Sequence, residues 1–86
     1  MQILVTGGAG FIGANFLNRF VPAHPDHMFI NVDKLTYAGN PANLSGIETA
    51  SNYRFEKCDI AEPEAVVEIF ARYRPEWVVH FAAESH

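Results

Sequence analysis

The sequence predicts an α/β fold in which helices cover a parallel sheet. Four short runs of apolar residues, typical of strands, alternate with two segments whose apolar residues recur at helical spacing. The connections between them are short, apart from a polar stretch over residues 33–52. In this order, consecutive strands lie parallel and are joined by right-handed crossovers.

The first strand is predicted at residues 3–5, an apolar run that ends at two glycines and is typical of a strand buried on both faces. A helix is predicted after these glycines, and Pro22 and then Pro25 are expected to end it. The apolar residues at helical spacing are Ile12, Phe16, Leu17 and Phe20. The second strand is predicted at residues 28–32, ending at Asp33.

Residues 33–52 are expected to form mostly loop, although Asn40-Pro41 can begin a short helical turn that reaches Leu44. The third strand is predicted at residues 53–57, where apolar and charged side chains alternate, so that one face meets solvent.

A second helix is predicted to start at Glu62-Pro63 and to end before Pro75. Its apolar stripe consists of Val66, Ile69, Phe70 and Tyr73. The fourth strand is predicted at residues 77–81.

These elements predict a Rossmann-like sheet with the strand order 3-2-1-4, the first half of a doubly wound domain. This order places the amphipathic third strand at an edge, in agreement with its pattern. The other edge of the fourth strand would lie open, so we expect residues 1–86 to be one fragment of a larger domain.

The glycines between the first strand and the first helix are typical of a phosphate-binding turn. Gly7, Gly10 and Gly13 satisfy G-x-x-G-x-x-G, and Gly8, Gly10 and Gly13 satisfy G-x-G-x-x-G. Glycine permits the tight turn, the close approach of a pyrophosphate and the contact between helix and sheet. The helix start then offers N–H groups and a positive dipole to the phosphates.

Asp33 ends the second strand twenty positions beyond Gly13. A carboxylate at this place can accept hydrogen bonds from an adenosine ribose and repels a 2′-phosphate. The sequence therefore favours NAD over NADP, although the neighbouring Lys34 could accommodate that phosphate.

Three segments resemble the extended short-chain dehydrogenase/reductase family and, within it, the dTDP-glucose 4,6-dehydratases. They are residues 3–13, residues 33–40 and residues 80–86. The resemblance spans the whole chain, although members of the family are several times longer. A sugar-nucleotide epimerase or decarboxylase of the same family and a non-catalytic NAD-binding module remain alternatives.

The resemblance implies contacts with NAD throughout the chain and with the nucleotide sugar at Ser85. The implied cofactor residues are Gly7, Gly10, Phe11, Ile12, Gly13, Asp33, Lys34, Leu35, Thr36, Asp59, Ile60, Phe81, Ala82, Ala83, Glu84 and Ser85. In the family, NAD accepts a hydride from the glucose ring, water is lost, and the hydride returns to the sugar. The acid-base residues of that chemistry have no counterpart assigned here, so we expect the 86-residue chain alone to be inactive. The parent enzyme is expected to be a homodimer.

Tyr53 and Lys57 form a Tyr-x-x-x-Lys string, the spacing of a pair used in this family. On a helix this spacing brings two side chains together, whereas on a strand it separates them by roughly 13 Å along the chain. We interpret the string as a coincidence of the edge strand.

Other reactive residue types are given structural interpretations. His24 and His27 are expected to be exposed loop histidines, His80 a hydrogen-bonded histidine, and Cys58 an inert thiol. Four phenylalanines at helix or strand spacing are expected to belong to the core. They are Phe16, Phe20, Phe55 and Phe70.

The composition also limits the partners. With a net charge of -4 and six scattered basic residues, the chain has no electrostatic footprint for nucleic acid or an anionic membrane. One cysteine and no long apolar segment predict a cytoplasmic protein without a metal site.

Overall fold

The computed structural model describes residues 1–8, 10–34 and 44–81. Strand β1 (Gln2–Thr6) leads into helix α1 (Phe11–Ala23), and β2 (Met28–Asp33) follows. Strand β3 (Tyr53–Lys57), helix α2 (Pro63–Tyr73) and β4 (Trp77–His80) complete the order. All four strands lie parallel in the sheet order β3-β2-β1-β4, which confirms the predicted topology.

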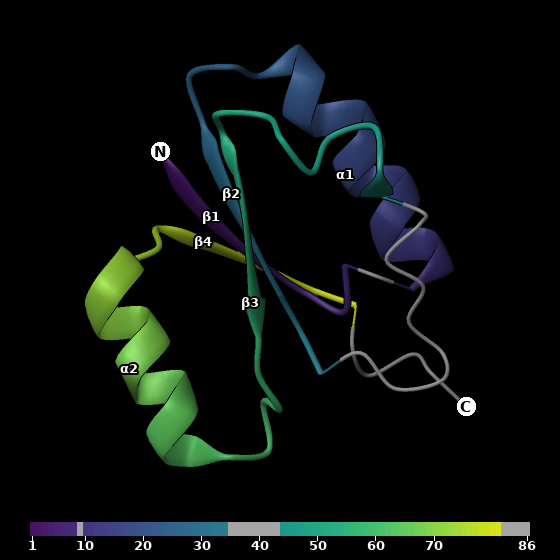
Figure 1. Cartoon of the computed structure of the whole chain (residues 1–86). Helices are drawn as coiled ribbons and strands as arrows, with labels where there is room; N and C mark the ends of the chain where they lie inside the picture. Colours follow the sequence, from purple (N-terminus) through teal and green to yellow (C-terminus); the bar gives the residue numbers. More distant parts are fainter. Residues whose placement is uncertain (9, 35–43, 82–86) are drawn as a thin grey trace.

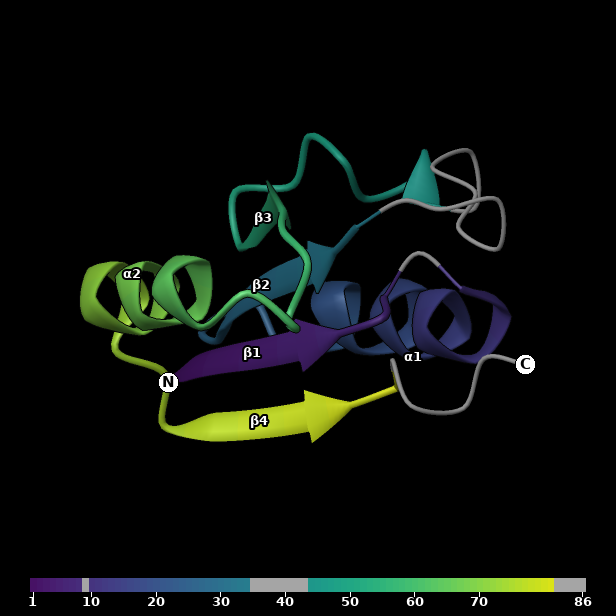
Figure 2. The same cartoon turned by 90° about the horizontal axis from the view of Figure 1, so that it is seen from below.

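The two helices lie on opposite faces of the sheet, as Figures 1 and 2 show. Successive side chains of a strand point to opposite faces, so each central strand contributes to two cores. On the α1 face, Val5 and Phe29 pack with Leu17. On the α2 face, Leu4 and Ile30 pack with Ile69. Burial on both faces explains the apolar runs in the middle of β1 and over most of β2.

The loop before β3 closes the α1 core from the edge. Leu44 and Ile47 are both 4% exposed and belong to the same cluster as Tyr53. The Asn52 amide donates to the carbonyls of Val21 and His24, which joins the loop to the end of α1. The predicted turn at Asn40-Pro41 lies outside the described residues.

Helix α1 continues past Pro22 and ends at Ala23, between Pro22 and Pro25, the two prolines expected to end it. A proline in the last turn removes one intrahelical hydrogen bond and leaves the preceding ones intact. The amide of His24 then donates to Phe20 O at 3.0 Å and caps the helix.

Helix α2 begins at Pro63, as predicted, and ends at Tyr73; its C-cap residue, Arg74, has the left-handed conformation (φ 50°). The Arg74 amide donates to Phe70 O, an arrangement common at helix ends. Tyr73 OH donates to a carboxylate oxygen of Glu56, and Arg72 pairs with the same carboxylate at 3.0 Å. These contacts join the end of α2 to the edge strand β3.

The prediction that four phenylalanines belong to the core was wrong for two of them. Phe16 and Phe20 pack against the α1 core, with ring centroids 4.7 Å apart. Phe55 is 39% exposed and Phe70 is 40% exposed. Phe55 lies on an edge strand, and only Ile69 of α2 is fully buried, so the periodicity overestimated how far each element is covered.

Strand β4 is the least covered strand of the sheet. Trp77 is 60% exposed and Val78 is 51% exposed, although both occupy an apolar run. Among the strands that the structure describes, only β1 pairs with it, along one edge. Phe81, predicted as the last residue of this strand, follows it. Across the described ranges, no helix is both long enough and apolar enough to cross a membrane.

Truncation of Leu17 should destabilise the chain strongly. Its side chain is fully buried between α1 and the sheet, so Leu17→Ala is expected to lower the free energy of unfolding by about 2–5 kcal/mol. Val67→Ala is the matched control on α2, because Val67 is 67% exposed, and should change it by less than about 0.5 kcal/mol. Urea unfolding followed by circular dichroism measures both, and equal effects would contradict the assigned core.

Candidate functional site

The residues singled out from the sequence follow the carboxyl ends of the parallel strands. Thr6 ends β1 and pairs with Val32 of β2 and His80 of β4, so these strands end at one edge of the sheet. The glycine turn follows β1 and Asp33 ends β2 at this edge (Figure 1). In open α/β sheets this edge is where ligands bind.

The turn begins at Gly7, whose φ of 74° is in the region that favours glycine. The Gly7 amide donates to Val32 O at 3.0 Å, which ties the turn to β2. The Gly10 amide donates back to Gly7 O at 3.2 Å and closes the turn. The chain thus reverses from strand to helix within a few residues.

Two glycines of the turn leave no room for a side chain. A Cβ atom on Gly8 would lie 2.6 Å from Leu17 Cδ1 and would overlap the Asn31 amide oxygen. A Cβ on Gly13 would lie 2.7 Å from Gly8 Cα and would overlap the Gly7 carbonyl. These contacts press the start of α1 against the end of β1.

Gly10 differs from Gly8 and Gly13. A Cβ on Gly10 would meet only Gly7 O, at 3.5 Å, so packing within the chain does not require a glycine there. The absence of a side chain keeps this backbone accessible to a ligand, which is the role expected of a glycine beside a pyrophosphate.

The start of α1 is not capped by a side chain. Gly10 is the N-cap residue, and the first turn contains no acidic residue. The first amides of a helix have no intrahelical acceptor and carry the positive end of its dipole. Phe11 and Ile12, which follow, are 79% and 51% exposed. The start of α1 therefore suits an anionic group, and its two exposed apolar side chains flank that place.

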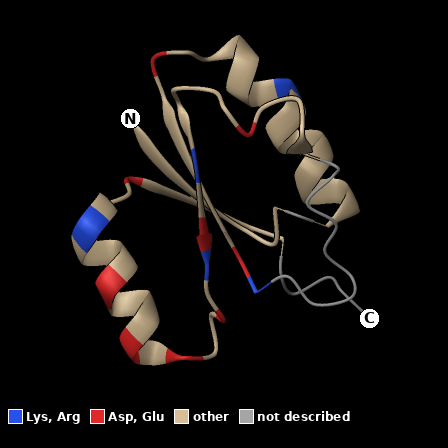
Figure 3. Ribbon diagram, in the orientation of Figure 1, with Lys and Arg blue, Asp and Glu red and all other residues tan. Residues whose placement is uncertain are grey.

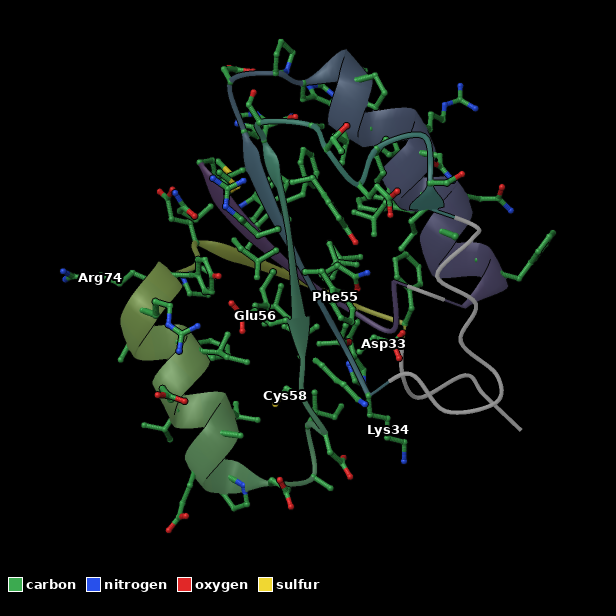
Figure 4. All side chains as sticks on the ribbon, viewed as in Figure 1. Asp33, Lys34, Phe55, Glu56, Cys58 and Arg74 are labelled. Atoms are coloured by element: carbon green, nitrogen blue, oxygen red, sulfur yellow. The ribbon has the colours of Figure 1, made fainter. Side chains whose placement is uncertain are left out.

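Asp33 and Lys34 lie at the end of β2, where Figure 4 labels both. Asp33 is partly buried and Lys34 is exposed. The backbone carbonyl of Asp33 accepts the Cys58 amide at 3.1 Å, which fixes the end of β2 beside β3. Figure 3 shows this pair as adjacent acidic and basic positions; other acidic residues lie along α2 and the segment before it, and elsewhere in the chain.

Asp59 and Ile60 follow β3 at the same edge of the sheet. The Asp59 carboxylate accepts the Ala61 amide at 2.9 Å, and its carbonyl accepts the Glu62 amide at 2.9 Å. Ile60 is 40% exposed. Asp59 therefore shapes the turn into α2, and Ile60 presents an apolar surface beside it.

Phe81 follows β4, and its amide donates to Thr6 O at 2.8 Å. Its ring lies 5.5 Å from that of Phe16, so it packs towards α1. Six predicted site residues lie outside the described residues. They are Leu35, Thr36, Ala82, Ala83, Glu84 and Ser85.

Tyr53 and Lys57 lie on β3, so the strand predicted for this string is confirmed. Tyr53 is 5% exposed, and its hydroxyl oxygen accepts a hydrogen bond from the Asn31 side-chain amide at 3.1 Å. Burial raises the pKa of the Tyr53 hydroxyl above its ordinary value, although the hydrogen bond from Asn31 lowers it in part. A buried hydroxyl that keeps its proton does not suit a general base.

The remaining reactive side chains have structural partners. His80 Nδ1 shares a short hydrogen bond with the Thr6 hydroxyl. The His24 ring stacks between those of Phe20 and His27, so these two histidines are partly buried and the prediction of exposed loop histidines was wrong. Burial, and then the carboxylates of Glu62, Asp59 and Glu56, raise the pKa of the Cys58 thiol, which disfavours a reactive thiolate. Over the described ranges no group of three possible metal ligands converges.

Asn31 is a residue of this region that sequence reasoning missed. It is fully buried inside β2, and its side-chain oxygen accepts the Gly8 amide at 3.0 Å. The available signal was a single amide within the apolar run Met28–Val32. A polar residue in such a run needs a partner, and here the partner is the glycine turn.

Comparison with known proteins gives three consistent likenesses. The chain is 50% identical over its whole length to a probable dTDP-glucose 4,6-dehydratase of Sinorhizobium fredii, of which it spans 24%. It is 42% identical, with a TM-score of 0.92 over 98% of its length, to the Bacillus anthracis dTDP-glucose 4,6-dehydratase in complex with NAD, of which it covers 27%. The UDP-glucose 4-epimerase of Thermotoga maritima is 38% identical with a TM-score of 0.81, over 99% of this chain and 25% of the epimerase.

The chain thus spans about a quarter of the length of the relatives it matches. These likenesses confirm the resemblance to extended short-chain dehydrogenase/reductase dehydratases. The sequence model of the GDP-mannose 4,6 dehydratase family matches residues 4–86, and the chain therefore belongs to that family.

Proposed function

We propose that this chain is the NAD-binding portion of a dTDP-glucose 4,6-dehydratase. The observation that carries the proposal is the glycine turn, which leads into an uncapped helix start at the same sheet edge as Asp33. Dehydratases of this name are 42–50% identical to it over nearly its whole length, and one of them was crystallised with NAD.

The residues of the chain fit a dinucleotide. The accessible backbone at Gly10 and the amides at the start of α1 would hold the pyrophosphate, because both supply N–H groups without a covering side chain. The Asp33 carboxylate would accept hydrogen bonds from the adenosine ribose. Ile60 would offer an apolar contact to the adenine ring. When bound, NAD supplies a reversible hydride acceptor.

The roles of the other predicted residues also belong to the proposal. Phe81 and the segment after it would line the cofactor, and Ser85 would reach the nucleotide sugar. We propose dTDP-glucose as the substrate, the cytoplasm as the location and a homodimer as the parent assembly, in line with the resemblance. Residues 1–86 would then act as one cofactor-binding unit.

A second candidate is a sugar-nucleotide 4-epimerase. The likeness to the Thermotoga maritima UDP-glucose 4-epimerase supports it, because the turn and the sheet are common to both. The higher identity to the dehydratases favours the first candidate. A non-catalytic NAD-binding module would share all the cofactor contacts and would differ only in lacking the chemistry.

The chain should bind NAD and prefer it to NADP. Asp33→Ala removes the carboxylate that would receive the ribose hydroxyls, so we expect NAD affinity to fall about tenfold and the preference over NADP to shrink. Calorimetric titration of the wild type and the variant with each dinucleotide measures this, with circular dichroism to verify folding. A folded wild-type chain that ignores NAD would refute the proposal.

Gly13→Ala should abolish NAD binding. The added methyl group would overlap the Gly7 carbonyl, which is backbone, so the start of α1 must move away from the turn. The matched control is Gly46→Ala, because a Cβ there has nothing within 4 Å. We expect the control to bind NAD as the wild type does. Equal affinity in both variants would show that the turn does not form the site.

The chain alone should not convert dTDP-glucose. An acid-base pair positioned at the reacting centre is needed for the dehydration, and none is assigned among these residues. Incubation with NAD and dTDP-glucose, followed by mass spectrometry, should show no product lighter by one water. Turnover by the isolated chain would overturn this proposal and would require a search for acid-base residues within it.

A further inference from the structure

Asn31 occupies an unusual place for a polar residue. It lies in the middle of β2, on the face that α1 covers, and its exposed fraction is 0%. Its neighbours along the strand, Ile30 and Val32, are apolar and belong to the core of the opposite face. Burial of an amide is unfavourable unless its oxygen and nitrogen both find partners.

Both ends of the Asn31 amide have such partners. The side-chain oxygen accepts the Gly8 amide at 3.0 Å, and the side-chain nitrogen donates to the Tyr53 hydroxyl oxygen at 3.1 Å. Gly8 belongs to the turn after β1, and Tyr53 begins the edge strand β3. The two hydrogen bonds therefore run from the turn, across β2, to the edge of the sheet.

The turn has little freedom to leave Asn31. A Cβ on Gly8 would overlap the Asn31 oxygen and lie 2.6 Å from Leu17 Cδ1, so the backbone at Gly8 is held between a strand and a helix. The preceding amide, of Gly7, donates to Val32 O. Two successive amides of the turn thus bind to β2, whereas the amides at the start of α1 have no intrahelical acceptor and are available to a ligand.

We infer that Asn31, oriented by Tyr53, is the positioning residue of the glycine turn. By fixing the position of the turn, Asn31 sets the affinity for the dinucleotide. This second step rests on the proposed function. Neither side chain needs to touch the ligand, because the Gly8 contact fixes where the turn and the start of α1 lie. The Gly8 N–H is a donor only and therefore faces the amide oxygen, while the buried hydroxyl of Tyr53 accepts from the amide nitrogen and holds the Asn31 side chain in this orientation.

The test compares three variants with the wild-type chain. Asn31→Leu removes both hydrogen bonds while keeping the branched shape, Asn31→Asp keeps an oxygen for Gly8, and Tyr53→Phe removes only the partner that orients the amide. Val21→Ala is the matched control, because Val21 is 1% exposed in the same core but contributes none of the atoms nearest to a Cβ built on Gly8. Hydrogen exchange of the Gly8 amide, followed by NMR, and calorimetric titration with NAD are the two readouts.

We expect the Gly8 amide to exchange slowly in the wild type and at least tenfold faster in Asn31→Leu, with NAD affinity about tenfold weaker. Asn31→Asp should keep most of the wild-type protection of the Gly8 amide and most of the NAD affinity. Tyr53→Phe should show faster Gly8 exchange and weaker NAD binding than the wild type, both by smaller factors than Asn31→Leu. Val21→Ala should leave NAD affinity unchanged in the folded chain.

Each contrary outcome points to one claim. Unchanged Gly8 exchange in folded Asn31→Leu, or in Tyr53→Phe if the former does not fold, overturns the positioning role. Faster Gly8 exchange in Asn31→Leu with unchanged NAD affinity overturns the link between the position of the turn and NAD binding. A loss of NAD affinity in Val21→Ala equal to that in Asn31→Leu overturns the same link. A wild-type chain that ignores NAD refutes the proposed function, and Gly8 exchange still decides whether Asn31 positions the turn.

Discussion

The close contact between the end of β1 and the start of α1 is the constraint on which the rest of the structure depends. Gly13 meets the Gly7 carbonyl so closely that no Cβ fits between them. This contact lays α1 across the sheet with Leu17 and Val21 directed into the core. It also directs the amides of the first helical turn to the carboxyl edge of the sheet, where Asp33 lies. Packing and anion binding thus depend on the same backbone approach.

Much of this arrangement could be predicted from the sequence because its determinants are local. Apolar runs bounded by glycine and proline marked the strands, and the glycine spacing marked the turn. The strand order followed from the Rossmann topology that the alternation of strands and helices and the glycine turn indicate. The boundaries of β3 and the start of α2 at Pro63 agree with the prediction, since proline and regular alternation are strong local signals.

What sequence reasoning missed depends on distant contacts. Asn31 interacts with Gly8 and Tyr53, both more than twenty positions away, and no local pattern indicates that its amide is shared between them. Phe55 and Phe70 have the periodicity of core residues, yet nothing among the described residues covers them fully. The stacking of His24 on Phe20 likewise depends on how α1 ends, between the two prolines expected to end it.

The position of β4 beside β1 has a consequence for how the chain folds. The pairing of Thr6 with His80 joins residues 74 positions apart, whereas β2 lies next to β1 in the chain, separated only by α1. Closing a long loop costs more conformational entropy than forming contacts between elements that are close in the sequence, and it is therefore slower. We thus expect β1, α1 and β2 to assemble first. During synthesis, one edge of β1 therefore stays unpaired until β4 has emerged from the ribosome. A central, buried strand thus gains its second neighbour only after β2 and β3 have been made.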